Sequence, residues 1–467
     1  MINYITDILN AALKKIGLES KEIILEKPKE EKFGDLSTNL ALSLAKEFKK
    51  NPRDIAKEII DNLEFDKNLI DKIGIAGAGF INFYISDNFY KDNLKLILQK
   101  KSEYGKSDLN KNKTANIEWV SANPTGPLHA GHGRHICLGK AIANLLEWIG
   151  YKVTREYYYN DAGYQMSILG QSIESGYKQI FDSRIQFRDD MYKGEYVKKI
   201  AEEIYEEYKR NLPPGDDFWI KRGEKYCLNL IKKTLKILKI KHDIFFKESS
   251  LYPYNILIIN TEDVENIDIY KKKKLSSSGI IKLLNEFKTK NLIYKKDNAW
   301  WLKMKSGGFQ DDKVIIKSDD IATNRRSEPT YRLPDMAYHI DKINRGYDLI
   351  LDIFGSDHSD TYKEVLFGVK SAGYAISNIK VIIHQMVTFK KGEESVKMSK
   401  RSDDVYYLDD LIEDVGVDAT QFFFVMRSAN TQLDFDIELA KDKSEKNPVY
   451  YLQYAHARIC GILRNAE

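Results

Sequence analysis

Cysteine is scarce in this chain. Its 467 residues include only Cys137, Cys227 and Cys460, which are widely separated and show no metal-ligand spacing. We therefore expect neither disulfide bonds nor a structural zinc site.

Long apolar runs are missing as well. No uninterrupted apolar run approaches the ~20 residues that a helix needs to cross a bilayer. Residues 1–17 place their apolar side chains at helical spacing around Asp7, which is typical of a packing helix rather than a signal peptide. We expect a cytoplasmic protein.

Charge of one sign is not in excess. The 73 basic and 69 acidic residues leave a net charge of +4, which is too small to steer a nucleic acid by itself. Such a partner would have to bind local basic patches, for which 46–50 and 271–274 are candidates, although a solvated surface is the alternative for each. The length is sufficient for several packed domains.

A strand, a helix and a second strand follow one another in the first half of the chain. We predict them at 114–120, 127–149 and 151–159, so the sheet should be parallel. Ligands of such sheets bind at the carboxyl ends of the strands. The polar segments 121–124 and 160–163 lie at two of these ends.

The sequence around the start of that helix suits a polyphosphate ligand. Over 118–132 it reads Glu-Trp-Val-Ser-Ala-Asn-Pro-Thr-Gly-Pro-Leu-His-Ala-Gly-His. Pro127 suits the first helical position, and phosphate binds well at the positive end of a helix. His129 and His132 would share one helix face, and Gly131 would let an adenine or ribose lie between the two imidazoles. A chance pair of histidines on a solvated face is the alternative.

A second basic segment lies far downstream. Residues 390–401 read Lys-Lys-Gly-Glu-Glu-Ser-Val-Lys-Met-Ser-Lys-Arg, which predicts a mobile loop able to close over a polyphosphate. The ammonium groups of Lys397 and Lys400 suit the charge on a leaving pyrophosphate. Taken alone, such a loop fits a solvated turn as well. Together, the two segments indicate a protein that handles ATP.

The two segments, in this order, resemble the His-x-Gly-His and Lys-Met-Ser-Lys signatures of class I aminoacyl-tRNA synthetases. The stretch 121–132 resembles the arginyl version of the first signature, with alanine in place of isoleucine. Further stretches resemble arginyl-tRNA synthetases at 159–163, 192–196, 333–339 and 354–358, and the resemblance covers nearly the whole chain, from 33–35 to 450–458.

The resemblance implies an α/β fold. We expect a class I synthetase Rossmann-like catalytic domain with a parallel sheet, an N-terminal α+β additional domain, a helical insertion and the start of a C-terminal helical domain. The predicted limits are 1–110 for the additional domain, 111–165 and 313–404 for the two halves of the catalytic domain, 166–312 for the helix-rich insertion, 405–445 for a helical stem and 446–467 for the first helix of an anticodon-binding domain.

Apolar runs predict further elements. Residues 73–85 alternate apolar residues with glycines, as in a hairpin or bulged strand. The second half of the catalytic domain should resume at a strand near 314–317, followed by buried strands at 347–354 and 379–385. From Tyr406 onward we expect helices.

Two features depart from the arginyl pattern. Members of that family normally continue into a further helical domain that reads the anticodon, and we expect only its first helix here, as in a truncated form. The stretch 319–329 is also longer and more polar than the usual link ahead of Tyr331.

The resemblance also implies roles for individual residues. It assigns catalysis to four side chains, His129, His132, Lys397 and Lys400. ATP contacts fall to Pro127, Gly131, Gly355, Asp357, His358, Met398 and Ser399.

The amino-acid pocket can be argued from charge as well. A planar guanidinium needs carboxylates and a flat neighbour to stack on. The matching positions assign Glu118 and Asp335 to the guanidinium and Tyr331 to its plane. Ser121 and Asn123 are assigned to the α-amino end, and a helix or strand surface role is the alternative for each residue.

In the additional domain, the resemblance assigns Phe33, Asp35 and Asn39 to contacts with the elbow of the tRNA. Capping and packing of the helix after Asp35 is the alternative.

The expected reaction is ATP-dependent activation of L-arginine to arginyl-adenylate, followed by transfer to the terminal adenosine of tRNA(Arg). ATP would bring Mg²⁺ with it rather than fill a dedicated metal cage, and we expect a monomer with no tightly bound cofactor. Two alternatives remain: another adenylyl-transferring enzyme of this fold, and a non-catalytic protein that binds tRNA or a partner.

Overall fold

The chain forms two compact units in the computed structural model, residues 1–106 and 107–467. The first unit ends close to the limit at 110 that the sequence predicts. The structure describes all residues except 20–21, 162, 212, 214, 216, 254–260, 266–277, 319–327, 393, 397–404 and 467.

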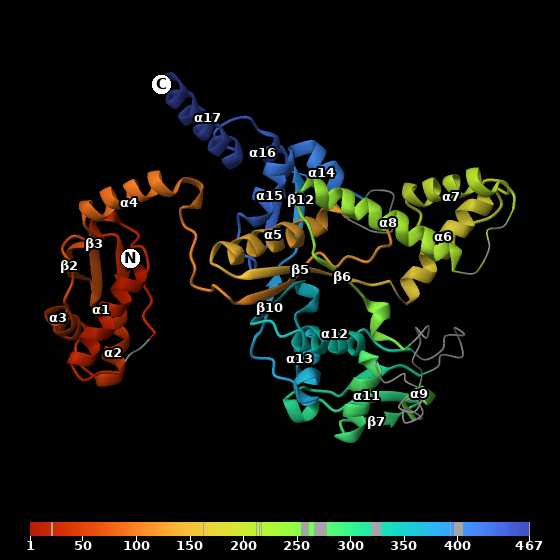
Figure 1. Cartoon of the computed structure of the whole chain (residues 1–467), viewed down its shortest axis with the longest axis horizontal. Helices are drawn as coiled ribbons and strands as arrows, with labels where there is room; N and C mark the ends of the chain where they lie inside the picture. Colours follow the sequence, from red (N-terminus) through yellow and green to blue (C-terminus); the bar gives the residue numbers. More distant parts are fainter. Residues whose placement is uncertain are drawn as a thin grey trace. The chain divides into compact units, whose positions relative to one another are not determined.

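The N-terminal unit packs helices against a three-stranded antiparallel sheet of order β1-β3-β2 (Figure 1). Its elements are α1 (Ile2–Lys15), a 3-10 turn (Glu31–Phe33), β1 (Leu36–Thr38), α2 (Leu40–Phe48), α3 (Pro52–Asp61), β2 (Ile70–Ala76), β3 (Phe80–Ile85), α4 (Asp87–Lys100) and a 3-10 turn (Lys101–Glu103).

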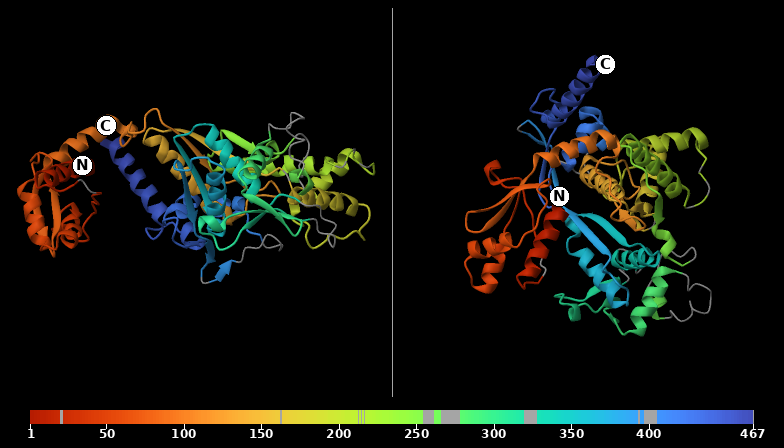
Figure 2. Two further views of the ribbon diagram at one scale, coloured as in Figure 1. Left: turned by 90° about the horizontal axis from the view of Figure 1, so that it is seen from below. Right: turned by 60° about the vertical axis from the view of Figure 1, so that its left-hand side comes forward.

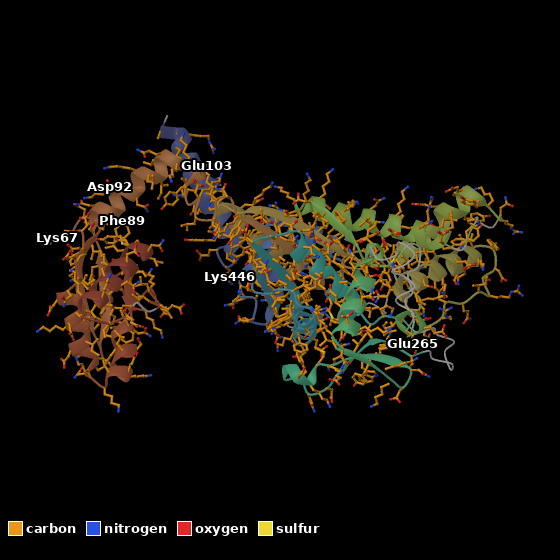
Figure 3. The ribbon with its side chains drawn as sticks, turned by 60° about the horizontal axis from the view of Figure 1, so that its bottom comes forward. Lys67, Phe89, Asp92, Glu103, Glu265 and Lys446 are labelled. Carbon is orange, nitrogen blue, oxygen red and sulfur yellow. The ribbon has the colours of Figure 1, made fainter. Side chains whose placement is uncertain are left out.

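Two predictions for this unit can be compared with the structure. The hairpin is confirmed as β2 and β3, with a register shift between Ile70 and Lys72. Helix α1 buries one apolar face, as a packing helix should. Helix α4, which is described throughout, buries none of its residues, and Asp92 stands out from it (Figure 3).

The second unit, residues 107–467, is built on a parallel five-stranded sheet of order β11-β10-β4-β5-β6. Its strands are β4 (Thr114–Glu118), β5 (Lys152–Tyr159), β6 (Ile244–Lys247), β10 (Leu349–Gly355) and β11 (Ile379–His384). Helix α5 (Gly133–Trp148) joins β4 to β5, which confirms the predicted parallel unit.

Helices cover both faces of this sheet. Helix α5 packs on one face, beside α15 (Val417–Val425), and α12 (Arg332–Asn344) and α13 (Thr361–Ser371) lie on the other, as the views of Figures 1 and 2 show. Separate apolar cores form on the two sides, with Trp119 and Phe424 in one and Met336 in the other.

The segment between β5 and β10 differs from the predicted insertion. Helices α6 (Tyr164–Gln179), α7 (Glu195–Tyr208) and α8 (Phe218–Ile237) come first, and α7 starts beside the tyrosine motif as predicted. The next strand, β6, pairs with β5 and belongs to the parallel sheet. The range 166–312 is therefore not wholly an insertion. The place of β6 in this sheet depends on its pairing with β5, far away in the chain, which no local pattern reveals.

A small antiparallel sheet follows, of order β7-β8-β9. The strand expected near 314–317 exists as β9, but it belongs to this small sheet and not to the parallel one. The elements here are a 3-10 turn (Glu248–Leu251), α9 (Thr261–Glu265), α11 (Gly279–Thr289), β7 (Ile293–Lys296), β8 (Ala299–Leu302), a 3-10 turn (Lys305–Gly307) and β9 (Lys313–Ile316).

The C-terminal part is mostly helical but adds a third sheet, of order β13-β12-β14. The strand β14 lies within the range predicted as a helical stem, and it pairs in parallel with β12. The elements are β12 (Val387–Lys391), β13 (Glu394–Val396), α14 (Leu408–Val415), β14 (Leu433–Asp436), α16 (Ile437–Lys441) and α17 (Pro448–Ala466). None of the helices within the described ranges is long and apolar enough to span a membrane.

Candidate active site

The strand that leads into the site ends earlier than predicted. Glu118 is the last residue of β4, and Val120 and Ser121 then adopt φ angles of 71° and 39°. A positive φ in a β-branched residue is strained, and such strain is concentrated at functional sites. Tyr157 steadies the turn, because its hydroxyl donates to the Ala122 carbonyl oxygen over 2.6 Å.

The helix after this loop does not open at Pro127. A 3-10 turn spans Ala130–His132, and α5 begins only at Gly133. The cause is tertiary: the Ala130 N–H donates to the Tyr406 carbonyl oxygen, and the Leu128 carbonyl oxygen accepts from the Leu408 N–H. This backbone pairing holds the intervening residue extended, so the helix cannot start there.

The two signature histidines meet through that turn rather than on a helix face. Their rings stack with centroids 3.6 Å apart, and the His129 N–H donates to His132 Nδ1 over 3.2 Å. Nothing fits between rings at this distance, so the expected adenine or ribose does not lie there. Gly131 is required for another reason, since a Cβ there would lie 2.9 Å from His129 Nδ1.

A pocket opens beside the stacked histidines. It brings together four of the predicted residues, Asn123, Pro127, His129 and His132. Tyr192, Tyr196 and Tyr407 complete its wall, and the Tyr196 hydroxyl donates to the Thr125 carbonyl oxygen over 2.6 Å.

Three carboxylates lie in register across the neighbouring strands of the sheet. Asp352 on β10 pairs with Glu118 on β4, which pairs with Glu156 on β5. All three are buried. Charged residues are almost never buried unless they are paired, and α12 supplies the partners of this carboxylate row.

Lys342 of α12 pairs with two members of the row. Its ammonium contacts Glu118 Oε2 and lies 2.5 Å from Asp352 Oδ1. Burial alone would lower the pKa of Lys342, but Asp352 and Glu118 raise it well above its usual range. The other oxygen of Glu118, Oε1, accepts from the Ser121 hydroxyl over 3.0 Å.

His339 joins the row to Asp335. Its Nε2 lies 3.1 Å from Asp352 Oδ2, and its Nδ1 lies 3.0 Å from Asp335 Oδ1 and 2.8 Å from the Asp335 carbonyl oxygen. Burial alone would lower the pKa of His339, but Asp335 and Asp352 raise it to about 10. The imidazole is therefore a cation between two carboxylates.

A further carboxylate, Glu248, faces the same region and was not anticipated. It is buried, and it accepts from the hydroxyls of Tyr158 over 2.9 Å and Tyr252 over 3.3 Å. Burial raises the pKa of Glu248 to about 7, and Asp161 and Asp335 add to the rise by repulsion. Two carboxylates that repel each other favour a cation between them.

The remaining predicted pocket residues lie nearer the surface. Tyr331 caps the N-terminus of α12 one turn before Asp335, as expected, and is 58% exposed. The Arg332 guanidinium lies 4.8 Å from the centre of its ring. The Asn123 amide donates to Gln165 Oε1 of α6 over 2.6 Å.

The expected nucleotide site lies at the ends of β10 and β11. After Gly355 the chain forms a 3-10 turn, Ser356–His358, and His384 ends β11 close by. A Cβ on Gly355 would lie 2.6 Å from Asp357 Oδ1, so a larger residue here would displace the exposed Asp357 side chain. The four predicted residues of the basic segment, Lys397, Met398, Ser399 and Lys400, lie outside the described residues, as do the patch 271–274 and the stretch 319–327.

Two family models match the chain. "Arginyl tRNA synthetase N terminal domain" matches residues 3–85, and "tRNA synthetases class I (R), catalytic domain" matches residues 93–433. The chain belongs to the class I arginyl-tRNA synthetases. Enzymes of this family are arginine–tRNA ligases, and ATP is their substrate.

Individual relatives agree. The chain is 44% identical to the arginine–tRNA ligase of Pelodictyon phaeoclathratiforme, over 100% of this chain and 81% of that protein. It is 43% identical to that of Chlorobaculum parvum, over 98% of this chain and 79% of the relative. The solved Thermus thermophilus arginyl-tRNA synthetase shares the fold, with a TM-score of 0.71 at 18% identity, over 100% of this chain and 82% of that one. Synthetases for other amino acids are thereby excluded.

In the N-terminal unit of this arginyl-tRNA synthetase, two of the three predicted tRNA contacts line a groove and the third has partners within the protein. Phe33 and Asn39 line a groove together with Lys27, Lys29 and the exposed Phe80. Asp35 has a structural role, because its carboxylate accepts from the Ile85 N–H and the Tyr90 hydroxyl, each over 2.8 Å. For Asp35 the packing alternative therefore fits better than an exposed tRNA contact.

The sequence did carry one signal for the missed residues of the synthetase. Asp335, His339 and Lys342 are four and three residues apart, so they share one face of α12. The same face carries apolar residues of the core. Ionisable residues on a buried helix face need charged partners, and this could have pointed to a carboxylate row in the sheet.

Proposed function

We propose that the region between Glu118, Asp335 and Glu248 binds the side chain of L-arginine. The carrying observation is an excess of carboxylates: four of them, Glu118, Asp335, Asp352 and Glu248, meet only two described cations, Lys342 and His339. A guanidinium supplies one of the two missing positive charges and donates in the fork geometry that carboxylates accept. Tyr331 at the exposed edge would cover its plane.

We assign the α-amino end to the loop after β4. Ser121 and Asn123 lie there, and the strained turn presents them at the carboxyl end of the central strand. The carboxylate of arginine would then point toward the pocket of His129 and His132.

Activation follows as an in-line attack of the arginine carboxylate on the α-phosphate of ATP, which releases pyrophosphate. His129 and His132 would donate hydrogen bonds to the phosphates, and Lys397 and Lys400 would neutralise the leaving pyrophosphate. The base and ribose are assigned to Gly355, Asp357 and His358. Mg²⁺ would enter with ATP, bound largely by its phosphates and water.

Transfer then moves the arginyl group to the terminal adenosine of tRNA(Arg). We propose that the groove of the N-terminal unit holds part of the tRNA elbow. Its lysines suit phosphate, and Phe33 and Phe80 offer faces for an unstacked base. The predicted domain limits, the monomeric state and the cytoplasmic location stay predictions of this proposal.

The decisive experiment is ATP–pyrophosphate exchange with each of the twenty amino acids, with and without total tRNA. Exchange with arginine alone supports the assignment, and a requirement for tRNA shows that the chain engages it. Exchange with another amino acid instead would refute the assigned pocket. Silence throughout would favour the non-catalytic alternative for this chain.

A further inference from the structure

Asp352 stands at the centre of the buried charges, although it touches neither the loop after β4 nor the exposed edge of the site. It is fully buried on β10. One of its oxygens lies 2.5 Å from the Lys342 ammonium and the other lies 3.1 Å from His339 Nε2. Both cations therefore share a single anion that is held rigidly in the sheet.

Each cation then reaches a different carboxylate of the proposed arginine site. Lys342 occupies Oε2 of Glu118, which leaves Oε1 on the side of Ser121. His339 occupies Oδ1 of Asp335. Because a hydrogen bond to one oxygen fixes the plane of a carboxylate, each cation sets the direction in which the second oxygen points.

The protonation of His339 follows from geometry. Both ring nitrogens face groups that only accept hydrogen bonds, the carboxylates of Asp335 and Asp352 and the carbonyl oxygen of Asp335. A neutral imidazole donates from one nitrogen only, whereas an imidazolium donates from both. With all three carboxylates ionised, this connected set carries three negative and two positive charges, so one negative charge is uncompensated.

We propose that Lys342 and His339, anchored on Asp352, are positioning residues that aim Glu118 and Asp335 at the guanidinium and make the site select a cation over a neutral side chain of the same shape. This inference rests on the proposed function. The uncompensated charge lies in a buried setting, where electrostatic interactions are stronger than in water. L-Citrulline, which has a neutral ureido group in place of the guanidinium, should gain little from it.

Helix α12 offers a matched control. Arg345 is also a cation of this helix that pairs with the carboxylate row, with Nη1 and Nη2 lying 2.7 and 2.8 Å from the oxygens of Glu156. It contacts neither Glu118 nor Asp335 through any interaction described for it. Loss of Arg345 therefore perturbs the helix–sheet contact without changing the aim of the proposed arginine ligands.

The test is isothermal titration calorimetry of the full chain with L-arginine and with L-citrulline, on the wild type, Lys342→Met, His339→Gln and Arg345→Met. We expect Lys342→Met and His339→Gln to weaken arginine binding at least tenfold while citrulline binding changes less than threefold. Arg345→Met should change both affinities less than threefold. Thermal unfolding followed by circular dichroism verifies that each variant is folded, and His339→Gln carries the test if Lys342→Met does not fold.

The possible failures are distinct. Folded variants that bind arginine as the wild type does, or that lose arginine and citrulline affinity in parallel, would overturn the positioning role alone. An equal loss of arginine affinity in Arg345→Met would also overturn it, by showing a general effect of helix packing. A wild type that binds no arginine would overturn the proposed function and this inference with it.

Discussion

The two ends of the active site hold their charges in opposite ways. At the guanidinium end, Glu118, Asp352 and Lys342 are buried and bound to one another. At the nucleotide end, the side chains of Asp357 and His358 are 76% and 55% exposed, and their nearest charged atoms lie 3.7 Å apart. The residues proposed to select the amino acid are thus part of the packed fold, whereas Asp357 and His358, proposed to contact the nucleotide, lie open to solvent.

The largest effect is expected from a substitution at the proposed guanidinium end of the site. Asp335→Ala removes a proposed ligand and leaves His339 with one carboxylate fewer, so kcat/KM for arginine should fall on the order of 100-fold or more, as for other broken charge pairs that cost about 2–5 kcal/mol. Arginine-dependent ATP–pyrophosphate exchange measures it, with the KM for ATP little changed. Asp341→Ala on the same helix, which removes an ion pair with Arg345, is the control. A fall of equal size in the control would count against the pocket.

A second prediction tests the phosphate side. His129→Ala should lower kcat about 100-fold, because removal of one contact made to developing charge typically costs about 3 kcal/mol. The KM for arginine should change less than threefold, since Asp335 does not line the pocket beside the stacked histidines. Exposed His456 on α17 provides the control substitution, His456→Ala. A rise in the arginine KM with unchanged kcat would contradict the assigned role.

A third prediction concerns pH at the guanidinium end. The pKa of Glu248 is raised to about 7, so part of this carboxyl is protonated in the free enzyme near neutrality. A bound guanidinium favours the carboxylate and lowers that pKa, so binding releases a proton and weakens as pH falls. Between pH 8 and 6 the affinity for arginine should drop about tenfold by this linkage. Calorimetry over this range measures it, and Glu248→Gln should flatten the dependence.

The smallest effect is expected in the N-terminal unit, away from both ends of the active site. Phe33→Ala in the N-terminal groove should raise the KM for tRNA about fivefold to tenfold, within the 1–3 kcal/mol typical of a base stacked on an aromatic ring. The KM values for arginine and ATP should stay unchanged. Half-buried Phe89 of α4, in the same unit, supplies the control variant Phe89→Ala (Figure 3). An aminoacylation assay measures this KM. If the KM for tRNA is unaltered in Phe33→Ala, Phe33 is not a tRNA contact.

Local patterns predicted the elements that local forces decide. The strands β10 and β11 are apolar runs, β4 and β5 flank the predicted helix of a strand–helix–strand unit, and the β2–β3 hairpin has glycines at its turn, so the sequence alone located them. The start of α5 could not be predicted, because backbone pairing with residues 406–408 overrides the preference of Pro127. Strand β6 was missed because its place in the parallel sheet comes from pairing with the distant strand β5.

The residues of the candidate site were likewise only partly predictable from the sequence. The motif residues of the loop after β4 were recognisable in sequence, and Asn123, Pro127, His129 and His132 do share a pocket. Asp352 and Glu248 were not recognisable, because their partners lie far away in the chain, and Lys342 was marked only by its spacing from Asp335 and His339 on one face of α12. Only the register of three strands and the seating of α12 bring those partners together.

The carboxylate row has a consequence for how such enzymes can diverge. A change at Glu118, Asp352 or Lys342 alone leaves a charge without its partner in the interior, which typically costs about 3–5 kcal/mol. Gradual drift at any one of these positions is thus opposed by the other two. Among relatives we expect the three to be replaced together or not at all, and their substitutions to be correlated across sequences that otherwise differ widely.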